Sequence, residues 1–94
     1  MSEQQQDVVL VGKKPVMNDV IACLTLFNAG QQTITVKARG GVISNAVETV
    51  ELLRRAFIKD LMIRGITIGS KEFEKLNGSV GTVSTIDIVV SKGK

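Results

Sequence analysis

Apolar and polar residues follow three different patterns in the first part of the chain. Val8 to Val11 is a continuous apolar run, typical of a strand that lies in the interior of a sheet. From Pro15 to Ala29 the apolar positions recur with helical spacing, Pro15 suits the first helical position, and Gly30 is placed to end the helix. Thr33 to Ala38 alternates between polar and apolar residues, as a half-buried strand does. This order predicts a βαβ unit with two parallel strands and a right-handed crossover.

The second half of the chain predicts one more helix and a long hairpin. The helix is expected to begin near Val42 to Ser44, and its apolar positions continue with helical spacing to Phe57. Leu61 to Glu74 is expected to form a long strand in which the alternation changes phase at Arg64-Gly65, and this change indicates a bulge. An Asn-Gly turn signal and a strand from Val83 to Val90 complete a hairpin that projects beyond the body of the domain.

The order β-α-β-α-β-β predicts a two-layer α/β fold. We expect a four-stranded mixed sheet with both helices on one face. Residues 8–92 are expected to form one domain, because 94 residues are too few for two cores, and the polar stretch Met1 to Asp7 is expected to be a disordered leader. Exposed apolar side chains at Phe57, Met62 or Ile66 would indicate a dimer interface.

Positive charge is concentrated in the first half of the chain. Between residues 8 and 46 four cations face one carboxylate, so this part has a net charge of +3 (4 − 1), equal to that of the whole chain. The cations are Lys13, Lys14, Lys37 and Arg39, and the carboxylate is Asp19. Lys13 and Lys14 follow a strand and precede a helix, where unpaired backbone N–H groups and the helix dipole favour an anion. We interpret this turn as a phosphate-binding site.

The composition argues against catalysis. Histidine, tryptophan and tyrosine are absent, so no imidazole can act as a general base and no Ser-His or Cys-His pair can form. The glutamates have the spacing of solvated faces, and we expect no metal and no cofactor. Three phenylalanines are the only aromatic residues, which argues against base stacking and favours contacts to the nucleic-acid backbone. A nuclease or other enzyme on this scaffold is the least favoured alternative.

The single cysteine and the hydropathy pattern indicate a cytoplasmic protein. One cysteine excludes an intrachain disulfide and is consistent with a reducing compartment. Cys23 lies on the apolar face of the first helix and is expected to be a small core residue, whereas Asn18 and Asp19 are expected in the first turn and off that face. No run approaches the roughly 20 apolar residues of a membrane span, so we expect no membrane partner.

Four segments of the sequence resemble the Alba family, the small basic chromatin proteins of archaea. They include the specific blocks Gly-Lys-Lys-Pro-Val-Met-Asn and Lys-Ala-Arg-Gly, and the similarity extends from about Val8 to Lys92. The four segments are residues 8–18, 36–40, 43–51 and 83–88. The resemblance implies a homodimer on the chromosome that binds double-stranded DNA, and also RNA, with little sequence preference. It also implies a fold like the C-terminal domain of bacterial translation initiation factor three.

The resemblance also implies contact residues. Lys13 and Lys14 would be central phosphate ligands, and the hairpin tip, Lys75 to Gly81, would reach into a minor groove. The implied nucleic-acid-binding set is Lys13, Lys14, Pro15, Asn18, Lys37, Arg39, Gly40, Gly41, Asn45, Lys75, Asn77 and Gly78. Lys13 is a candidate for acetylation, which would remove a charge and weaken binding. Phe57 occupies the position through which dimers of the family meet side by side.

Three departures from the family pattern lower the expected affinity for DNA. Positions that are usually basic are Gly41 and Asn45 here, and the hairpin tip carries only Lys75. Each missing phosphate contact lowers the salt dependence of binding by about one unit, so we expect weaker binding than in a more basic member. Phosphate contacts do not separate DNA from RNA, and a role as an RNA chaperone or ribonucleoprotein subunit stays open.

Overall fold

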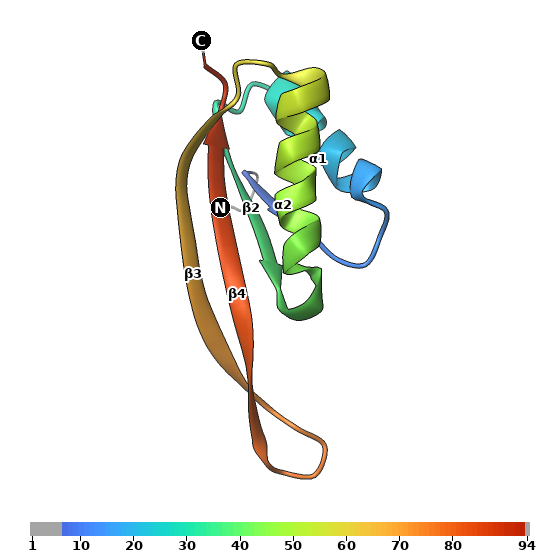
Figure 1. The fold of residues 1–94 in the computed structure, drawn as a ribbon, viewed down its shortest axis with the longest axis vertical. Helices are drawn as coiled ribbons and strands as arrows, with labels where there is room; N and C mark the ends of the chain where they lie inside the picture. Colours follow the sequence, from blue (N-terminus) through green and yellow to red (C-terminus); the bar gives the residue numbers. More distant parts are fainter. Residues whose placement is uncertain (1–6, 94) are drawn as a thin grey trace.

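Two helices pack on one face of a four-stranded mixed sheet, as the sequence predicts (Figure 1). The structure is a computed structural model and describes residues 7–93. Of the predicted leader, residues 1–6 lie outside the described part, and the Asp7 carbonyl accepts a hydrogen bond from the Thr35 N–H at 2.8 Å. In chain order the elements are β1 (Val8–Leu10), α1 (Val16–Asn28), β2 (Thr33–Arg39), α2 (Ile43–Leu52), β3 (Met62–Glu74) and β4 (Val80–Ser91).

The strand order in the sheet is β1-β2-β4-β3, with β1 parallel to β2 and the other pairs antiparallel. The parallel βαβ unit is therefore confirmed, but the prediction that Val8 to Val11 forms an interior strand is wrong. β1 lies at the edge of the sheet, where Val9 is buried and Leu10 is exposed. A run of four apolar residues is too short to show the alternation that distinguishes an edge strand from an interior one.

Helix α1 differs from the prediction at its start. Pro15 is the residue before the first turn rather than a member of it. Asp19 was expected off the apolar face, yet only 3% of its surface is exposed. The physical reason is the spacing, because Asp19 lies one turn before Cys23 and two before Phe27, and both of these are buried. The helix ends as predicted, with the Gly30 N–H donating to the Phe27 carbonyl at 3.1 Å.

The core lies between the two helices and the face of the sheet that they cover, which we call the helix-covered face; the other is the open face. Strands β2 and β4 contribute alternate residues to it, as the sequence predicts. The buried apolar residues are Val9, Val11, Val20, Cys23, Phe27, Ile34, Val36, Ala38, Ala46, Val50, Leu53, Leu61, Ile86, Ile88 and Val90. None of the helices in residues 7–93 is long and apolar enough to cross a membrane.

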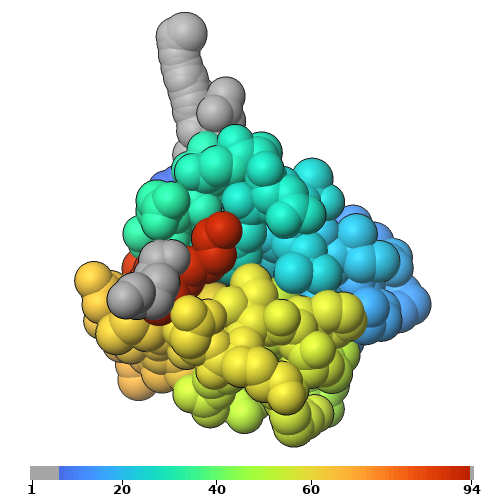
Figure 2. Space-filling view, turned by 90° about the horizontal axis from the view of Figure 1, so that it is seen from above, coloured from blue at the N-terminus to red at the C-terminus, as the bar shows by residue number. Residues whose placement is uncertain are grey.

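Helix α2 ends in a π-helical turn, Leu53–Phe57, in which the Ile58 N–H donates to the Leu53 carbonyl at 2.8 Å. The wider turn breaks the helical spacing, so Leu53 is buried while Phe57 is 46% exposed. Viewed from the end opposite the hairpin, the segment that follows α2 (yellow) lies at the surface beside α1 (blue to cyan) (Figure 2). Phe57 is therefore available for contact with a partner.

Strands β3 and β4 form a hairpin that extends well beyond the helices (Figure 1), in a molecule 48 Å long. The predicted irregularity is present, since the register shifts between Ile63 and Gly65. Because of this shift, Ile66 and Ile68 pair with the core residues Ile88 and Ile86 and lie on the helix-covered face. The helices do not reach them, and both are exposed.

Candidate nucleic-acid interface

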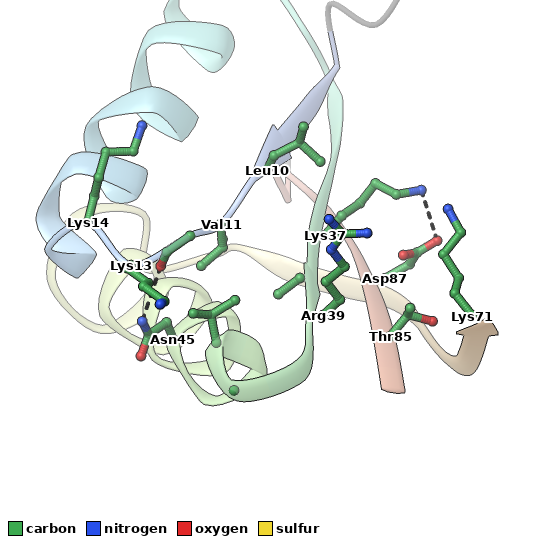
Figure 3. A pocket seen from close by; sticks show the side chains of 14 residues that line it. Leu10, Val11, Lys13, Lys14, Lys37, Arg39, Asn45, Lys71, Thr85 and Asp87 are labelled. Atoms are coloured by element: carbon green, nitrogen blue, oxygen red, sulfur yellow. Dashed lines mark hydrogen bonds and ion pairs between the residues drawn. The ribbon is translucent and has the colours of Figure 1, made fainter. Parts of the chain in front are cut away.

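A groove on the open face of the sheet collects most of the positive charge predicted from the sequence (Figure 3). Its walls come from the loop after β1, from β2 and the start of α2, and from strands β3 and β4. Among the described residues that line it are five cations and one carboxylate. The cations are Lys13, Lys14, Lys37, Arg39 and Lys71, and the carboxylate is Asp87. We call this feature the basic groove.

The parallel pairing of β1 and β2 brings the two cation-bearing turns together. Parallel strands end at the same edge of a sheet, so the loop that follows Leu10 lies beside the loop that follows Arg39. The Val11 N–H continues the pairing with a 2.8 Å hydrogen bond to the Lys37 carbonyl. Lys13 and Arg39, separated by 26 positions in sequence, therefore line one groove.

Asn45 holds the loop that carries Lys13. Its side-chain amide donates to the Gly12 carbonyl at 3.3 Å (Figure 3). Asn45 thus joins the start of α2 to the loop after β1. It is half-buried, and it positions Lys13 through the backbone of this loop. The neutral residue at this position adds no charge to the groove, but it supports the loop that carries Lys13.

Gly40 is required by the backbone where β2 leaves the sheet. Its φ is +63°, and a Cβ at this position would lie 3.0 Å from Cγ2 of Val83. Both constraints disfavour a larger residue, since L side chains rarely adopt this conformation and the Val83 side chain would have to move. The turn therefore directs Arg39 into the groove and starts the chain toward α2, while Gly41 lines the groove itself.

An ion pair lies inside the basic groove. Lys37 and Asp87 are directly opposite in the antiparallel pairing of β2 and β4, and Nζ of Lys37 lies 3.3 Å from Oδ2 of Asp87. The Lys71 side chain points toward the same carboxylate from β3 (Figure 3). The side chains of Lys37 and Asp87 are 44% and 37% exposed. Their ion pair therefore contributes little to stability, but it is an accessible part of the binding surface.

Asp19 is a buried carboxylate behind the loop that carries Lys14. Its Oδ2 has no hydrogen-bond partner among residues 7–93. Burial raises the pKa of Asp19 above its ordinary value, and the Lys14 ammonium lowers it by a smaller amount. Burial, reinforced by the Asp19 charge, raises the pKa of the neighbouring Cys23 to about 12. Cys23 is therefore an unreactive core thiol, as the sequence predicts.

Comparison with known proteins identifies the family. The family model described as Alba matches residues 7–70, more than half of the chain. The chain belongs to the Alba family. The structure of Alba from Thermoplasma volcanium is 39% identical and covers 90% of this chain and 99% of its own, with a TM-score of 0.85. A crystal structure of ALBA1 from Trypanosoma brucei is 27% identical and covers 96% of this chain and 72% of its own, with a TM-score of 0.76.

The predicted resemblance and fold are therefore confirmed, and membership of the Alba family indicates nucleic-acid binding. The structure of this Alba chain brings only part of the implied contact set together. The residues that line the groove are Lys13, Lys14, Lys37, Arg39, Gly41 and Asn45. The residues that lie elsewhere are Pro15 and Asn18 at the start of α1, Gly40 behind the groove, and Lys75, Asn77 and Gly78 at the exposed hairpin tip.

Two charged groove residues of this Alba chain are missing from the set inferred from sequence. Lys71 and Asp87 come from β3 and β4, and they reach the groove only because of how these strands pair. A signal was present in the alternation of the last strand, in which Asp87 falls between the core residues Ile86 and Ile88 and so must lie on the open face. For Lys71 a signal was present after the predicted bulge, because Ile66 and Ile68 alternate with it and Lys71 takes the opposite face of the strand.

Proposed function

We propose that this Alba protein binds double-stranded DNA through the backbone phosphates, as a homodimer that coats or compacts the chromosome in the cytoplasm. The proposal is carried by one observation, the convergence of Lys13, Lys14, Lys37, Arg39 and Lys71 on a single groove. Ammonium and guanidinium groups on a shallow surface suit phosphates, and phosphate contacts carry no direct sequence information. The proposed role is binding without a catalytic step, in keeping with the absence of histidine.

The test is a salt titration with labelled duplex DNA, comparing the parent with the Lys13→Ala, Lys14→Ala double variant. Each lost phosphate contact lowers the slope of log K against log salt by about 0.9, so the double variant should lose about 1.8 per protomer. Lys59→Ala with Lys92→Ala is the matched control, because these cations lie at the other end of the sheet. An unchanged slope and affinity in the Lys13, Lys14 variant would refute the phosphate assignment.

Duplex RNA of the same sequence separates the proposed ligand from the alternative. DNA is proposed because the family resemblance implies duplex DNA, whereas the phosphate contacts of the groove suit DNA and RNA alike. A 2′-hydroxyl contact would favour RNA at equal phosphate geometry. Binding to duplex RNA that is clearly tighter than binding to duplex DNA would assign the protein to RNA instead.

A homodimer is proposed because this chain leaves apolar side chains uncovered beside α2. Ile66 and Ile68 lie on the helix-covered face beyond the reach of the helices, and Met62 at the start of β3 is also exposed. A second copy that covers these residues would remove them from water and place two basic grooves in one particle. If both grooves of the dimer contact one duplex, the dimer makes twice as many phosphate contacts as a single chain.

Sedimentation of the free protein tests the dimer. Ile66→Asp is expected to give monomers, because it would bury a carboxylate in the contact. Leu76→Asp, a matched change of an equally apolar and fully exposed residue at the hairpin tip, should leave the dimer intact. A dimer that is unaffected by Ile66→Asp would place the interface elsewhere. For Phe57, we propose contact between neighbouring dimers on DNA, which Phe57→Ala should weaken as a loss of binding cooperativity.

A further inference from the structure

The part of the hairpin from Lys71 to Gly81, which we call the arm, has two chemically different faces. Residues alternate along a strand, so Lys71, Phe73 and Lys75 share one face and Glu72 and Glu74 the other. The first set lies on the open face, because Lys71 also lines the basic groove. The cationic face of the arm is therefore continuous with the groove, and the carboxylates face away from it.

Phe73 lies against the backbone of the neighbouring strand. It is directly opposite Gly81 in the pairing of β3 and β4. A Cβ on Gly81 would lie 2.8 Å from Cζ of Phe73 and 2.8 Å from Cε of Lys75. The absence of a side chain at Gly81 thus makes room for both the ring and the lysine stem. Phe73 is still 47% exposed, so the ring is supported from one side and open to solvent on the other.

The turn at the end of the arm fixes the position of Lys75. Its N–H donates to the Ser79 carbonyl at 2.8 Å, and its carbonyl accepts from the Gly78 N–H at 2.9 Å. The Ser79 N–H and hydroxyl both donate to Oδ1 of Asn77, at 3.1 and 2.7 Å. These bonds close the loop on itself, so Phe73 and its flanking lysines are held on an ordered strand end.

We propose that Phe73, with Lys71 and Lys75, binds an unpaired nucleobase by stacking while the two lysines contact the phosphates on either side. An aromatic face flanked by cations is the chemistry that recognises single-stranded nucleic acid. Bases inside a duplex are stacked on both sides and offer no free face, so this site selects unpaired DNA or RNA. It deepens the proposed function and rests on it, because the arm extends the surface that would bind the duplex backbone.

The three phenylalanines of the chain have separate environments, which their small number does not reveal. Phe27 is in the core and Phe57 follows α2, so only Phe73 lies beside the basic groove. One ring supplies one stacking position on each arm. No carboxylate shares its face between Lys71 and Lys75, so the local charge favours phosphate over an acidic or neutral protein segment.

The test compares Phe73→Ala, Phe73→Leu and Phe73→Trp on an unstructured oligonucleotide of about 16 nucleotides, as DNA and as RNA, and on duplex DNA. Removal of the ring in the Ala and Leu variants should weaken binding to the unpaired strand about fivefold or more. Duplex affinity should stay within about twofold, because the groove is intact. The Leu variant keeps an apolar side chain, so it separates stacking from simple burial.

Phe73→Trp adds a direct readout of stacking. The chain has no tryptophan or tyrosine, so the emission of this variant reports one position. The variant should bind as the parent does, and its emission should be quenched by the unpaired strand. Val80→Trp is the matched control, because Val80 is exposed and pairs with Glu74 on the opposite face of the arm. Its emission should not be quenched.

Two results would overturn the inference. One is parent-like affinity of the Ala and Leu variants for the unpaired strands. The other is an equal loss on duplex and unpaired strands, which would make Phe73 a general contact of the arm. A loss on both DNA and RNA oligonucleotides supports a site for any unpaired strand, and a loss on RNA alone supports one specific to RNA. Duplex binding that does not depend on Lys13 and Lys14 would refute the proposed function alone.

Discussion

Replacement of Asp87 by asparagine should strengthen the binding of nucleic acid. The carboxylate holds the Lys37 ammonium at 3.3 Å inside the basic groove, and Lys71 points toward it as well. Asparagine has the same shape and no charge. The substitution therefore frees Lys37 for a phosphate and removes an anion that repels one. The ion pair therefore weakens phosphate binding, and Asp87→Asn removes this competition for the Lys37 ammonium.

The expected size of the effect follows from the charges in the groove. Five cations and one carboxylate give the described lining residues a net charge of +4, which the substitution raises to +5 (5 − 0). One additional phosphate contact steepens the slope of log K against log salt by about 0.9 per protomer. Between about 50 and 200 mM salt the variant should therefore lose about 3.5 times as much affinity as the parent does. The fold itself should lose about 1 kcal/mol or less, since both partners are more than a third exposed.

The assay is the fluorescence anisotropy of a labelled duplex over a salt series. Glu72→Gln is the matched control, because it makes the same change of charge on the opposite face of the sheet. Asp87→Asn should bind more tightly at low salt and with a steeper slope, and Glu72→Gln should behave as the parent. Weaker binding, or a slope that equals that of the control, would show that Asp87 does not restrain a phosphate ligand.

Three further predictions concern the fold. Asp19→Asn should raise the free energy of unfolding by about 1 kcal/mol at pH 7. Burial raises the pKa of Asp19, so the ionised carboxylate destabilises the folded protein above that pKa. In urea titrations the gain from the substitution should vanish as the pH falls below about 3.8, where the carboxyl is protonated in both the folded and the unfolded chain. A loss at pH 7 would contradict this. Gly40→Ala should cost about 1–2 kcal/mol through its positive φ and the contact with Val83, seen as a lower Tm, whereas Gly41→Ala, which meets no atom within 4 Å, should not. With a pKa of about 12, Cys23 should react with a thiol reagent at the rate of unfolding, and rapid labelling of the folded protein would contradict its burial.

Local sequence patterns predict the helices and strands of this fold better than they predict which strands are neighbours in the sheet. The alternation in β2 and the helical spacing before Gly30 are long enough to fix which side chains enter the core. The position of β1 depends instead on which strand pairs with β2 on its other side, and a three-residue strand contains no such information. Asp19 shows a second limit, since a carboxylate on an apolar stripe looks like an exposed residue until its burial is known.

The residues of the basic groove that lie close together in the sequence could be predicted, and those from distant strands could not. Lys13, Lys14 and Arg39 follow two strands of one βαβ unit, and the rule that parallel strands end at the same edge is enough to bring them together. Lys71 and Asp87 depend on the antiparallel register of strands that are distant from that unit in the sequence. The ion pair that restrains Lys37 therefore becomes visible only when the pairing of β2 with β4 is known.

The bulge between Ile63 and Gly65 connects the core to the binding surface. Before it, the odd-numbered Ile63 pairs with Val90 of the core, and after it the even-numbered Ile66 and Ile68 take the same face. Without the extra residue, odd positions would stay on the helix-covered face along the whole strand. The lysines and Phe73 of the arm would then leave the open face, and Glu72 and Glu74 would extend the groove with negative charge. The charge of the arm is thus set by one inserted residue near the core, and the same phase change that keeps the isoleucines on one face of the sheet directs the cations to the other.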